Sequence, residues 1–246
     1  MARAAVRGRL ARRLAWQPAT LVERRVETPS ATTIVLTVPE WIEHVAGQHV
    51  DVRLTAEDGY RAQRSYSIAS APDADRIELT VQRVVDGEVS PYLADDLQLG
   101  DVIEVRGPVG GWFVWRPDDP GPVLLLGGGS GIVPLMAMLR TRRASGSAAP
   151  FRALYSVRTP DDVLYRDEPG VEVTHLYTRV APPDWPRRPG RLTAADLAES
   201  GWPPADAPTC YVCGPTGFVE AAADLLVALG HDPARIRTER FGPTGG

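Results

Sequence analysis

The residues best suited to binding a ligand form a glycine-rich run behind a short apolar segment. The run reads Gly127-Gly-Gly-Ser-Gly131 and follows Val123-Leu-Leu-Leu126 directly. Where such a turn joins a strand to a helix, its backbone N–H groups and the positive helix end attract an anion, and the missing Cβ atoms allow close approach. The usual dinucleotide spacing, Gly-x-Gly-x-x-Gly, is not met, because Ile132 or Pro134 stands where the third glycine belongs. A phosphate site and a tight structural turn without a ligand therefore both remain open.

Two later apolar segments each end in a hydroxyl and a guanidinium side chain. Ser156 and Arg158 end the first, and Thr178 and Arg179 end the second. The carboxyl ends of strands are where open α/β sheets bind ligands, and NAD enzymes place an acidic residue there to bind the ribose. A planar guanidinium instead suits a 2′-phosphate, so we expect NADPH rather than NADH. Solvent-exposed arginines are the alternative interpretation.

A third cluster lies in the first half of the chain. In an extended Arg64-Ser65-Tyr66-Ser67, the arginine and the tyrosine share one face and the two serines share the other. An arginine beside an aromatic ring provides a platform for a phosphate and a flat ring.

These residues must be positioned by two different kinds of structure. Short strands with β-branched residues or alternating polarity are predicted at 33–38, 49–54, 65–68, 77–81 and 101–105. After the linker-like segment 117–122, strands are predicted at 123–126, 152–157, 171–177 and 209–213, and helices at 132–143, 194–200 and 217–229. The first pattern favours an antiparallel sandwich or barrel, and the second a doubly wound parallel sheet. We therefore expect a basic arm over 1–15 and domains over 16–117 and 118–246.

Composition excludes several classes of function. The 27 basic residues are all arginine, so Walker-type phosphate loops, protein kinases and Schiff-base lysine enzymes are excluded. Two cysteines cannot form the usual four-thiolate iron–sulfur site, and Cys210 and Cys213 point to opposite faces of a strand, so no metal site is predicted. Cys210 is expected in the core.

Charge and hydropathy give further expectations. Residues 1–25 carry seven arginines against one acid, whereas the net charge of the chain is −4. We interpret the arm as a solvated terminus rather than a nucleic-acid contact. Without a secretory signal or an apolar run near ~18 residues, we expect a cytoplasmic monomer with no membrane or nucleic-acid partner.

The order of the motifs resembles the ferredoxin–NADP reductase family. Arg64-Ser-Tyr-Ser67, Gly87-Glu-Val-Ser90, the glycine run and Tyr211-Val-Cys-Gly-Pro215 occur in the family's order. The chain looks like the reductase components of bacterial oxygenases with their iron–sulfur domain missing. The resemblance implies an N-terminal antiparallel six-stranded flavin-binding barrel, followed by a doubly wound parallel-sheet nucleotide-binding domain.

The resemblance also implies a role for each motif residue. Ser67, Cys213 and Glu239 would be catalytic, with Ser67 near the flavin N5 and Cys213 beside the nicotinamide C4. A strand hydroxyl and a solvated carboxylate are the alternatives for Ser67 and Glu239. The implied cofactor-binding residues are Arg64, Ser65, Tyr66, Ser67, Gly87, Val89, Ser90, Gly128, Gly129, Ser130, Gly131, Ser156, Arg158, Thr178, Arg179, Cys213, Gly214, Pro215 and Phe241. Five residues follow Phe241, so a terminal aromatic stacked on the flavin does not match this chain.

The implied function is an FAD-dependent reductase. It would take hydride from NADPH, with NADH less favoured, and pass electrons singly to a separate ferredoxin-like protein or oxygenase. One alternative is a flavin or quinone reductase that uses a small diffusible acceptor. The other is a non-catalytic, nucleotide-binding regulatory subunit.

Overall fold

The computed structural model describes residues 15–168, 170 and 172–242. The chain divides into two compact units, Met1–Val114 and Trp115–Gly246. The domain boundary that we expected, between residues 117 and 118, lies three residues after this division of the chain. It stays a prediction. Apart from Ala15, the expected basic arm lies outside the described residues.

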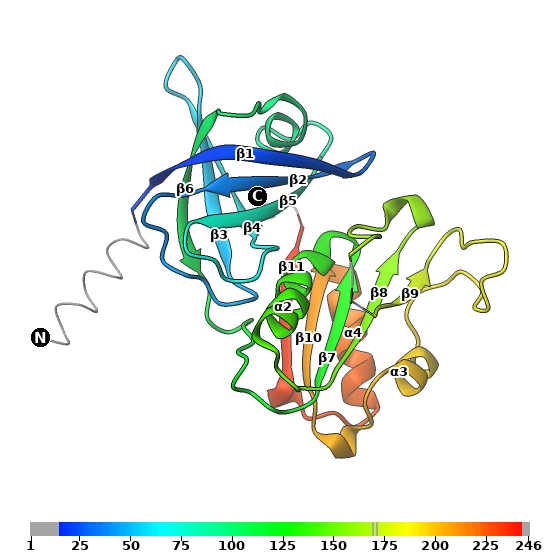
Figure 1. Cartoon of the computed structure of the whole chain (residues 1–246). Helices are drawn as coiled ribbons and strands as arrows, with labels where there is room; N and C mark the ends of the chain where they lie inside the picture. Colours follow the sequence, from blue (N-terminus) through cyan, green and yellow to red (C-terminus); the bar gives the residue numbers. More distant parts are fainter. Residues whose placement is uncertain (1–14, 169, 171, 243–246) are drawn as a thin grey trace, which may run out of the picture. The chain divides into compact units, whose positions relative to one another are not determined.

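The first unit is a six-stranded antiparallel sheet (Figure 1). Its strands are β1 (Gln17–Thr28), β2 (Ala31–Thr37), β3 (His49–Thr55), β4 (Arg61–Ser67), β5 (Arg76–Gln82) and β6 (Val102–Val109). They pair in the order β4-β3-β6-β1-β2-β5. A bridge between Ile68 and Leu79 links the two ends of this order and curls the sheet into a barrel. The predicted antiparallel barrel is confirmed.

Alternation along the strands creates the barrel core. Val50 and Val52 of β3 and Leu79 and Val81 of β5 are fully buried, and each strand places its polar residues on the opposite face. Burying an aliphatic side chain of this size stabilises the fold by about 1.5–3 kcal/mol. The core therefore fixes the direction of the intervening side chains, including those of β4.

The second unit is a five-stranded sheet with only parallel pairs. Its strands are β7 (Val123–Gly128), β8 (Phe151–Val157), β9 (Thr174–Tyr177), β10 (Thr209–Pro215) and β11 (Ile236–Phe241), in the order β11-β10-β7-β8-β9. The helices are α2 (Ile132–Ser145), α3 (Ala194–Ser200) and α4 (Thr216–Ala228).

Helices cover both faces of this parallel sheet, as predicted. Leu124 and Leu126 of β7 pack in one cluster with Leu197 of α3 and Leu226 of α4. The intervening Leu125 is also fully buried and points to the other face, where α2 lies (Figure 1). No helix among the described residues is both long enough and apolar enough to cross a bilayer.

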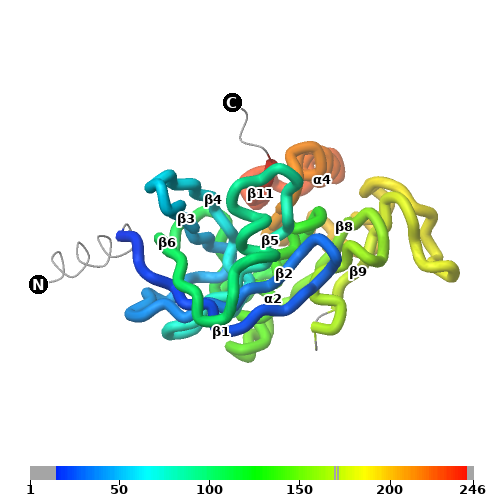
Figure 2. Tube along the Cα trace, turned by 90° about the horizontal axis from the view of Figure 1, so that it is seen from above, coloured from blue at the N-terminus to red at the C-terminus, as the bar shows by residue number. Residues whose placement is uncertain are grey.

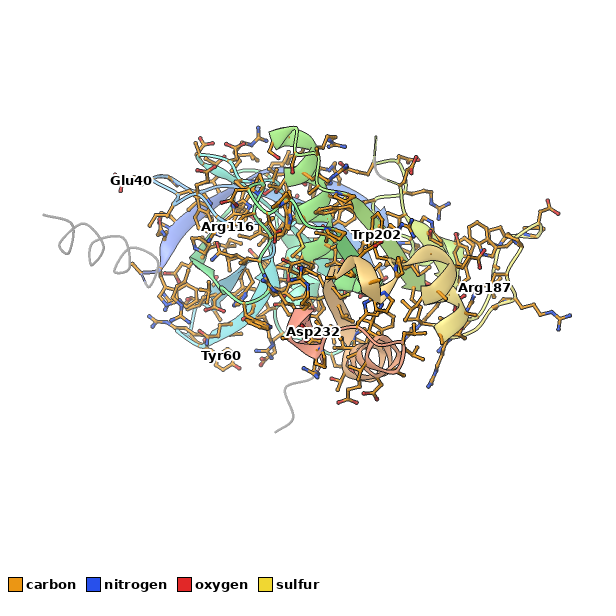
Figure 3. All side chains as sticks on the ribbon, turned by 90° about the horizontal axis from the view of Figure 1, so that it is seen from below. Glu40, Tyr60, Arg116, Arg187, Trp202 and Asp232 are labelled. Atoms are coloured by element: carbon orange, nitrogen blue, oxygen red, sulfur yellow. The ribbon has the colours of Figure 1, made fainter. Side chains whose placement is uncertain are left out.

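A long segment between β9 and α3 loops out from the sheet (Figure 2). Arg187, labelled in Figure 3, ties this loop to α3, because its Nη2 donates to Asp196 Oδ2 at 2.8 Å. Asp196 also accepts from the backbone and hydroxyl of Thr193, which caps α3. The loop that begins at Arg179 is thus anchored at its far end.

Candidate functional site

The first candidate half-site lies on strand β4 of the barrel. Arg64 and Tyr66 pair with Val52 and Val50 in β3, so their side chains leave the same face of the strand. Tyr66 packs against the barrel core, and burial raises its pKa to about 12, so its hydroxyl stays protonated. Arg64 is exposed, and its Nη1 donates to the Gln63 carbonyl at 2.7 Å. An exposed guanidinium beside a half-buried ring is a suitable arrangement for a phosphate joined to an aromatic group.

The two serines of this strand have different environments. Ser65 Oγ donates to Asp51 Oδ1 at 2.7 Å, and Arg106 binds the other oxygen of that carboxylate. The hydroxyl of Ser67 is buried and has no hydrogen-bond partner among the described residues. A buried polar group without a partner is costly, so a ligand that completed this bond would be favoured. Ser67 therefore fits a cofactor contact, whereas Ser65 is already engaged.

A compact loop follows β5 and contains the second implied flavin motif. Val84 N–H donates to Ser90 Oγ at 3.0 Å, and Gly87 N–H donates to the Val84 carbonyl at 3.0 Å. A Cβ at Gly87 would lie 3.0 Å from both Ser90 Oγ and the Val84 carbonyl, so glycine suits this turn. Val89 is 1% exposed and packs in the barrel core, so only its backbone is available to a ligand.

This loop also contacts the tip of the β3–β4 hairpin. Tyr60, labelled in Figure 3, donates its hydroxyl to Glu88 Oε1 at 2.7 Å. The other oxygen of Glu88 lies 3.5 Å from Arg64 Nη2. The guanidinium expected to bind a phosphate thus already has an anion beside it.

The second candidate half-site begins at the glycine run after β7. Gly129 has a φ of +54°, and a Cβ there would have nothing within 4 Å. A Cβ at Gly131, in contrast, would lie 2.0 Å from the Cys213 carbonyl oxygen, and one at Gly128 would lie 2.7 Å from the Phe218 ring. The run therefore combines close packing against β10 and α4 with an open backbone position at Gly129, beside Ser130.

Strand register brings the implied nicotinamide residues together. Cys213 of β10 lies opposite Gly127 of β7 and Glu239 of β11. Gly214 follows with a φ of +155°, and Pro215 lies opposite Phe241. Four of the implied residues, Cys213, Gly214, Pro215 and Glu239, thus share the carboxyl edge with the glycine run.

Burial controls the charge of this pair. Cys213 is fully buried, and burial together with nearby Glu239 raises the pKa of its thiol well above the usual range. Burial also raises the pKa of Glu239 to about 7. The thiol is therefore neutral at physiological pH, and the carboxyl can hold or release a proton there. Cys210 lies on the opposite face in the core with Leu124, and the predicted separation of the two cysteines is confirmed.

The hydroxyl and guanidinium pairs lie at the ends of adjacent strands β8 and β9. Thr178 N–H donates to the Val157 carbonyl at 2.8 Å, and Arg179 N–H donates to the Arg158 carbonyl at 2.9 Å. Both guanidinium groups are exposed, and within the described part of the chain neither makes an ion pair. Ser156 is 8% exposed, so its side chain is less accessible than that of Thr178. Two free cationic groups at one sheet edge could bind a phosphate monoester.

Fold and half-sites together define a class of two-unit nucleotide-binding redox proteins, and comparisons identify the family. Residues 18–114 match the oxidoreductase FAD-binding domain, and residues 125–224 match the oxidoreductase NAD-binding domain. The reductase subunit of an aromatic O-demethylase from Amycolatopsis is 30% identical over 96% of this chain and 72% of its own length. The chain belongs to the ferredoxin–NADP reductase-like family of FAD- and NAD(P)-binding oxidoreductases.

Other relatives are longer than this chain. A ferredoxin–NAD(P)+ reductase component of naphthalene dioxygenase and salicylate hydroxylase systems from Ralstonia is 30% identical over 83% of the chain, which covers 62% of that protein. A glycine betaine monooxygenase reductase subunit from Chromohalobacter salexigens is 33% identical over 80% of the chain, which covers 56% of it. The chain therefore spans less than two thirds of the length of these two relatives.

A solved structure has the same fold. The FAD/NAD-binding domain of a nitric oxide dioxygenase from Vibrio cholerae superposes with a TM-score of 0.81 at 28% identity, over 92% of this chain and 99% of that one. FAD and NAD(P) are thus the cofactors of the two domains. The unpartnered hydroxyl of Ser67 and the open backbone at Gly129 fit these two ligands.

Proposed function

We propose that this protein is an FAD-dependent reductase that takes hydride from NADPH and passes electrons one at a time to a separate iron–sulfur protein or oxygenase. The supporting observation is that Ser67 and Cys213 are buried polar groups, each inside a matched cofactor domain, and that half-buried Glu239 lies opposite Cys213 on the neighbouring strand β11. The names of the relatives, which include reductase components of oxygenase systems, favour the same function. When bound, FAD supplies the chemistry, because its ring takes up two electrons together and releases them singly.

The residues of the chain would orient and bind rather than react. Arg64 and the backbone of Gly87, Val89 and Ser90 would bind the FAD pyrophosphate. Tyr66 would pack on the ring, and Ser67 would donate or accept the hydrogen bond that its burial leaves unmade. For Ser65 to bind FAD as well, its hydroxyl must give up its hydrogen bond to Asp51 or form a second bond beside it.

The residues of the second domain would bind the coenzyme. Gly128, Gly129, Ser130 and Gly131 would accommodate the pyrophosphate. Cys213, Gly214, Pro215 and Phe241 would line the nicotinamide position, where neutral Cys213 excludes water and Glu239 holds or releases a proton.

The most direct test is the visible spectrum of the purified protein. We expect flavin bands that bleach with NADPH faster than with NADH, and electron delivery to an added ferredoxin. A colourless protein that binds no added FAD would contradict the proposal and indicate a nucleotide-binding regulatory subunit. Full activity with a free quinone and no gain from any ferredoxin would indicate a reductase for a small diffusible acceptor.

We also propose that Arg158 and Arg179, with Ser156 and Thr178, select NADPH. Charge-assisted hydrogen bonds of about 1.5–3 kcal/mol correspond to roughly 10- to 100-fold in affinity. Replacement of either arginine by alanine should therefore raise KM for NADPH by at least about tenfold and leave KM for NADH nearly unchanged. Arg188→Ala, an exposed arginine of the loop after β9, is the control and should change neither. Equal changes for both coenzymes would rule out this assignment.

We further propose that the protein works in the cytoplasm as a monomer, without nucleic-acid or membrane partners. Its two cysteines are free and buried, which suits a reducing compartment. Light scattering coupled to size-exclusion chromatography tests the monomer, and a mass near twice 26.6 kDa would contradict it.

A further inference from the structure

Three buried polar side chains lie in the segment between β2 and β3. Trp41, His44 and Gln48 are 6%, 2% and 4% exposed. Burying such groups without partners costs free energy, so their hydrogen bonds identify what the segment holds in place.

The bonds of His44 determine which of its nitrogens carries the hydrogen. Trp41 Nε1 lies 3.4 Å from His44 Nδ1, and an indole nitrogen can only donate, so Nδ1 accepts. The hydrogen of the neutral ring is then on Nε2, which donates to the Ser70 carbonyl at 3.1 Å. A neutral His44 thus connects Trp41 to the segment that follows β4.

Gln48 makes a second set of connections to the same region. Its Oε1 accepts from Val45 N–H at 2.8 Å, and its Nε2 donates to the Gly110 carbonyl at 2.6 Å. Its own carbonyl accepts from Ile68 N–H at 3.0 Å. Gln48 therefore ties the end of β4 to the turn after β6.

Several of these contacts lie at or directly after Ser67. Ser67 pairs with His49 in the strand register, Ile68 is held by Gln48, and Ser70 is held by His44. The Ser67 hydroxyl is itself buried without a partner. The segment thus fixes the backbone directly after Ser67, whose hydroxyl has no partner among the described residues.

We propose that Trp41, His44 and Gln48 are positioning residues that hold Ser67 in the orientation that binds FAD. This inference rests on the proposed function, and it makes FAD affinity depend on the protonation of His44. A proton on Nδ1 would face the indole N–H, so the Trp41 bond would be lost. The bond from Nε2 to Ser70 remains, but the ring loses the Trp41 bond that fixes its orientation. The resulting movement of the ring shifts Ser70 and weakens the contact of Ser67 with FAD.

The charged groups around His44 decide when this happens. Burial lowers the pKa of His44 below the usual histidine value. The hydrogen bond to the Ser70 carbonyl and the exposed carboxylates of Glu43 and Asp73 partly oppose this shift. The neutral ring is therefore fully populated at pH 7 and above. FAD affinity should therefore fall as pH decreases below the ordinary histidine pKa of about 6.5.

Two variants of His44 separate the positioning role from general packing. His44→Leu fills the space but makes neither bond, whereas His44→Gln can still donate to Ser70. Measured by quenching of flavin fluorescence at pH 7.5, the Kd for FAD should rise about tenfold in His44→Leu and about threefold or less in His44→Gln. Neither variant should show the acid-induced weakening of the wild type. His231→Gln, a buried histidine of the second unit, is the control and should retain it.

A double-mutant cycle with Ser67→Ala links the effect to that hydroxyl. If His44 acts through Ser67, His44→Leu should raise Kd by less than about threefold in the Ser67→Ala background. The inference would be overturned if the effects of the two substitutions on Kd were fully additive. It would also be overturned if His44→Gln still lost FAD affinity at low pH as the wild type does. If His44→Leu fails to fold, the pH dependence of FAD binding by His44→Gln is sufficient to test the inference. Failure of the wild-type protein to bind FAD at any pH would instead contradict the proposed function.

Discussion

At the scale of single residues, the half-buried carboxyl of Glu239 makes the stability of the fold depend on pH. Burial raises its pKa to about 7, above the value of an exposed glutamate. The folded state therefore binds a proton more tightly than the unfolded state does. This contribution to stability is fully present below about pH 4.5 and is lost as pH rises toward 7.

Replacing Glu239 by glutamine should remove this loss. We expect Glu239→Gln to increase the free energy of unfolding by about 1–2 kcal/mol at pH 8 and to change it little at pH 5. Urea unfolding at the two pH values measures the difference. Glu199→Gln, at an exposed position on α3, should be neutral at both. A gain of equal size at pH 5 would show that charge is not the cause.

Glu88 provides a second prediction at this scale. Its carboxylate lies 3.5 Å from Arg64 Nη2 and accepts from Tyr60 at 2.7 Å. A pyrophosphate at Arg64 must displace or tolerate this anion, which costs affinity. Glu88→Gln should therefore lower the Kd for FAD about two- to fivefold, because the pair is exposed and the effect of the charge is small.

The salt dependence of FAD binding checks the cause. Added NaCl should weaken binding more steeply in Glu88→Gln than in the wild type, because the unopposed cation attracts phosphate more strongly. Glu57→Gln, on the same hairpin, is a matched control without a contact to Arg64 and should leave the Kd unchanged. A weaker affinity in Glu88→Gln would mean that the contact with Tyr60 supports the loop rather than opposes the ligand.

The family resemblance predicted part of the candidate site. Motif order identified Ser67, Cys213 and Glu239, and the strand register later placed the last two side by side. His44 and Gln48 could not be selected from the sequence, because a histidine without metal-ligand spacing and a single glutamine have no distinctive pattern. Their partners, Ser70 and Gly110, are 26 and 62 residues away, and only the fold brings them together.

At the scale of elements, the glycine run has a packing role in addition to its proposed role in binding the coenzyme. A Cβ at Gly131 would meet the backbone of Cys213 at 2.0 Å, and backbone cannot rotate away. Gly131→Ala should therefore destabilise the fold by about 1–3 kcal/mol or more. Gly217→Ala, in the first turn of α4 with nothing within 4 Å, should stabilise it by up to about 1 kcal/mol. Urea unfolding in the absence of nucleotide measures both, and a neutral Gly131→Ala would contradict the packing.

Two strands were not expected as elements. Strand β1 contains the run Glu23-Arg24-Arg25 and a register shift after Leu21, so its alternation is broken where the charges lie. Strand β11 is a charged edge strand with no fully buried residue. Both form because a neighbouring strand pairs with them, which a local pattern does not encode. Strands β3 and β5 were predictable because their buried residues alternate.

At the scale of the whole molecule, the described part of the first unit is more acidic than the second unit. Residues 15–114 contain sixteen acidic and eight basic side chains, which gives −8, whereas residues 115–246 carry −1. The domain matched to FAD binding lies in the acidic unit. A field of this sign accelerates the approach of cations and slows that of anions. An electron acceptor that docks on this unit is expected to present a basic face.

Small acceptors of opposite charge test this asymmetry without a protein partner. The rate of reduction of hexaammineruthenium(III) should fall as NaCl rises from 10 to 300 mM, and that of ferricyanide should rise, because salt screens both interactions. A neutral quinone should show neither trend. Residues 1–14 carry five arginines that partly offset the field, so replacing them by glutamine should steepen both slopes. If ferricyanide instead reacts faster at low salt, the acceptor meets a locally cationic surface, and an acidic ferredoxin becomes the expected class of partner.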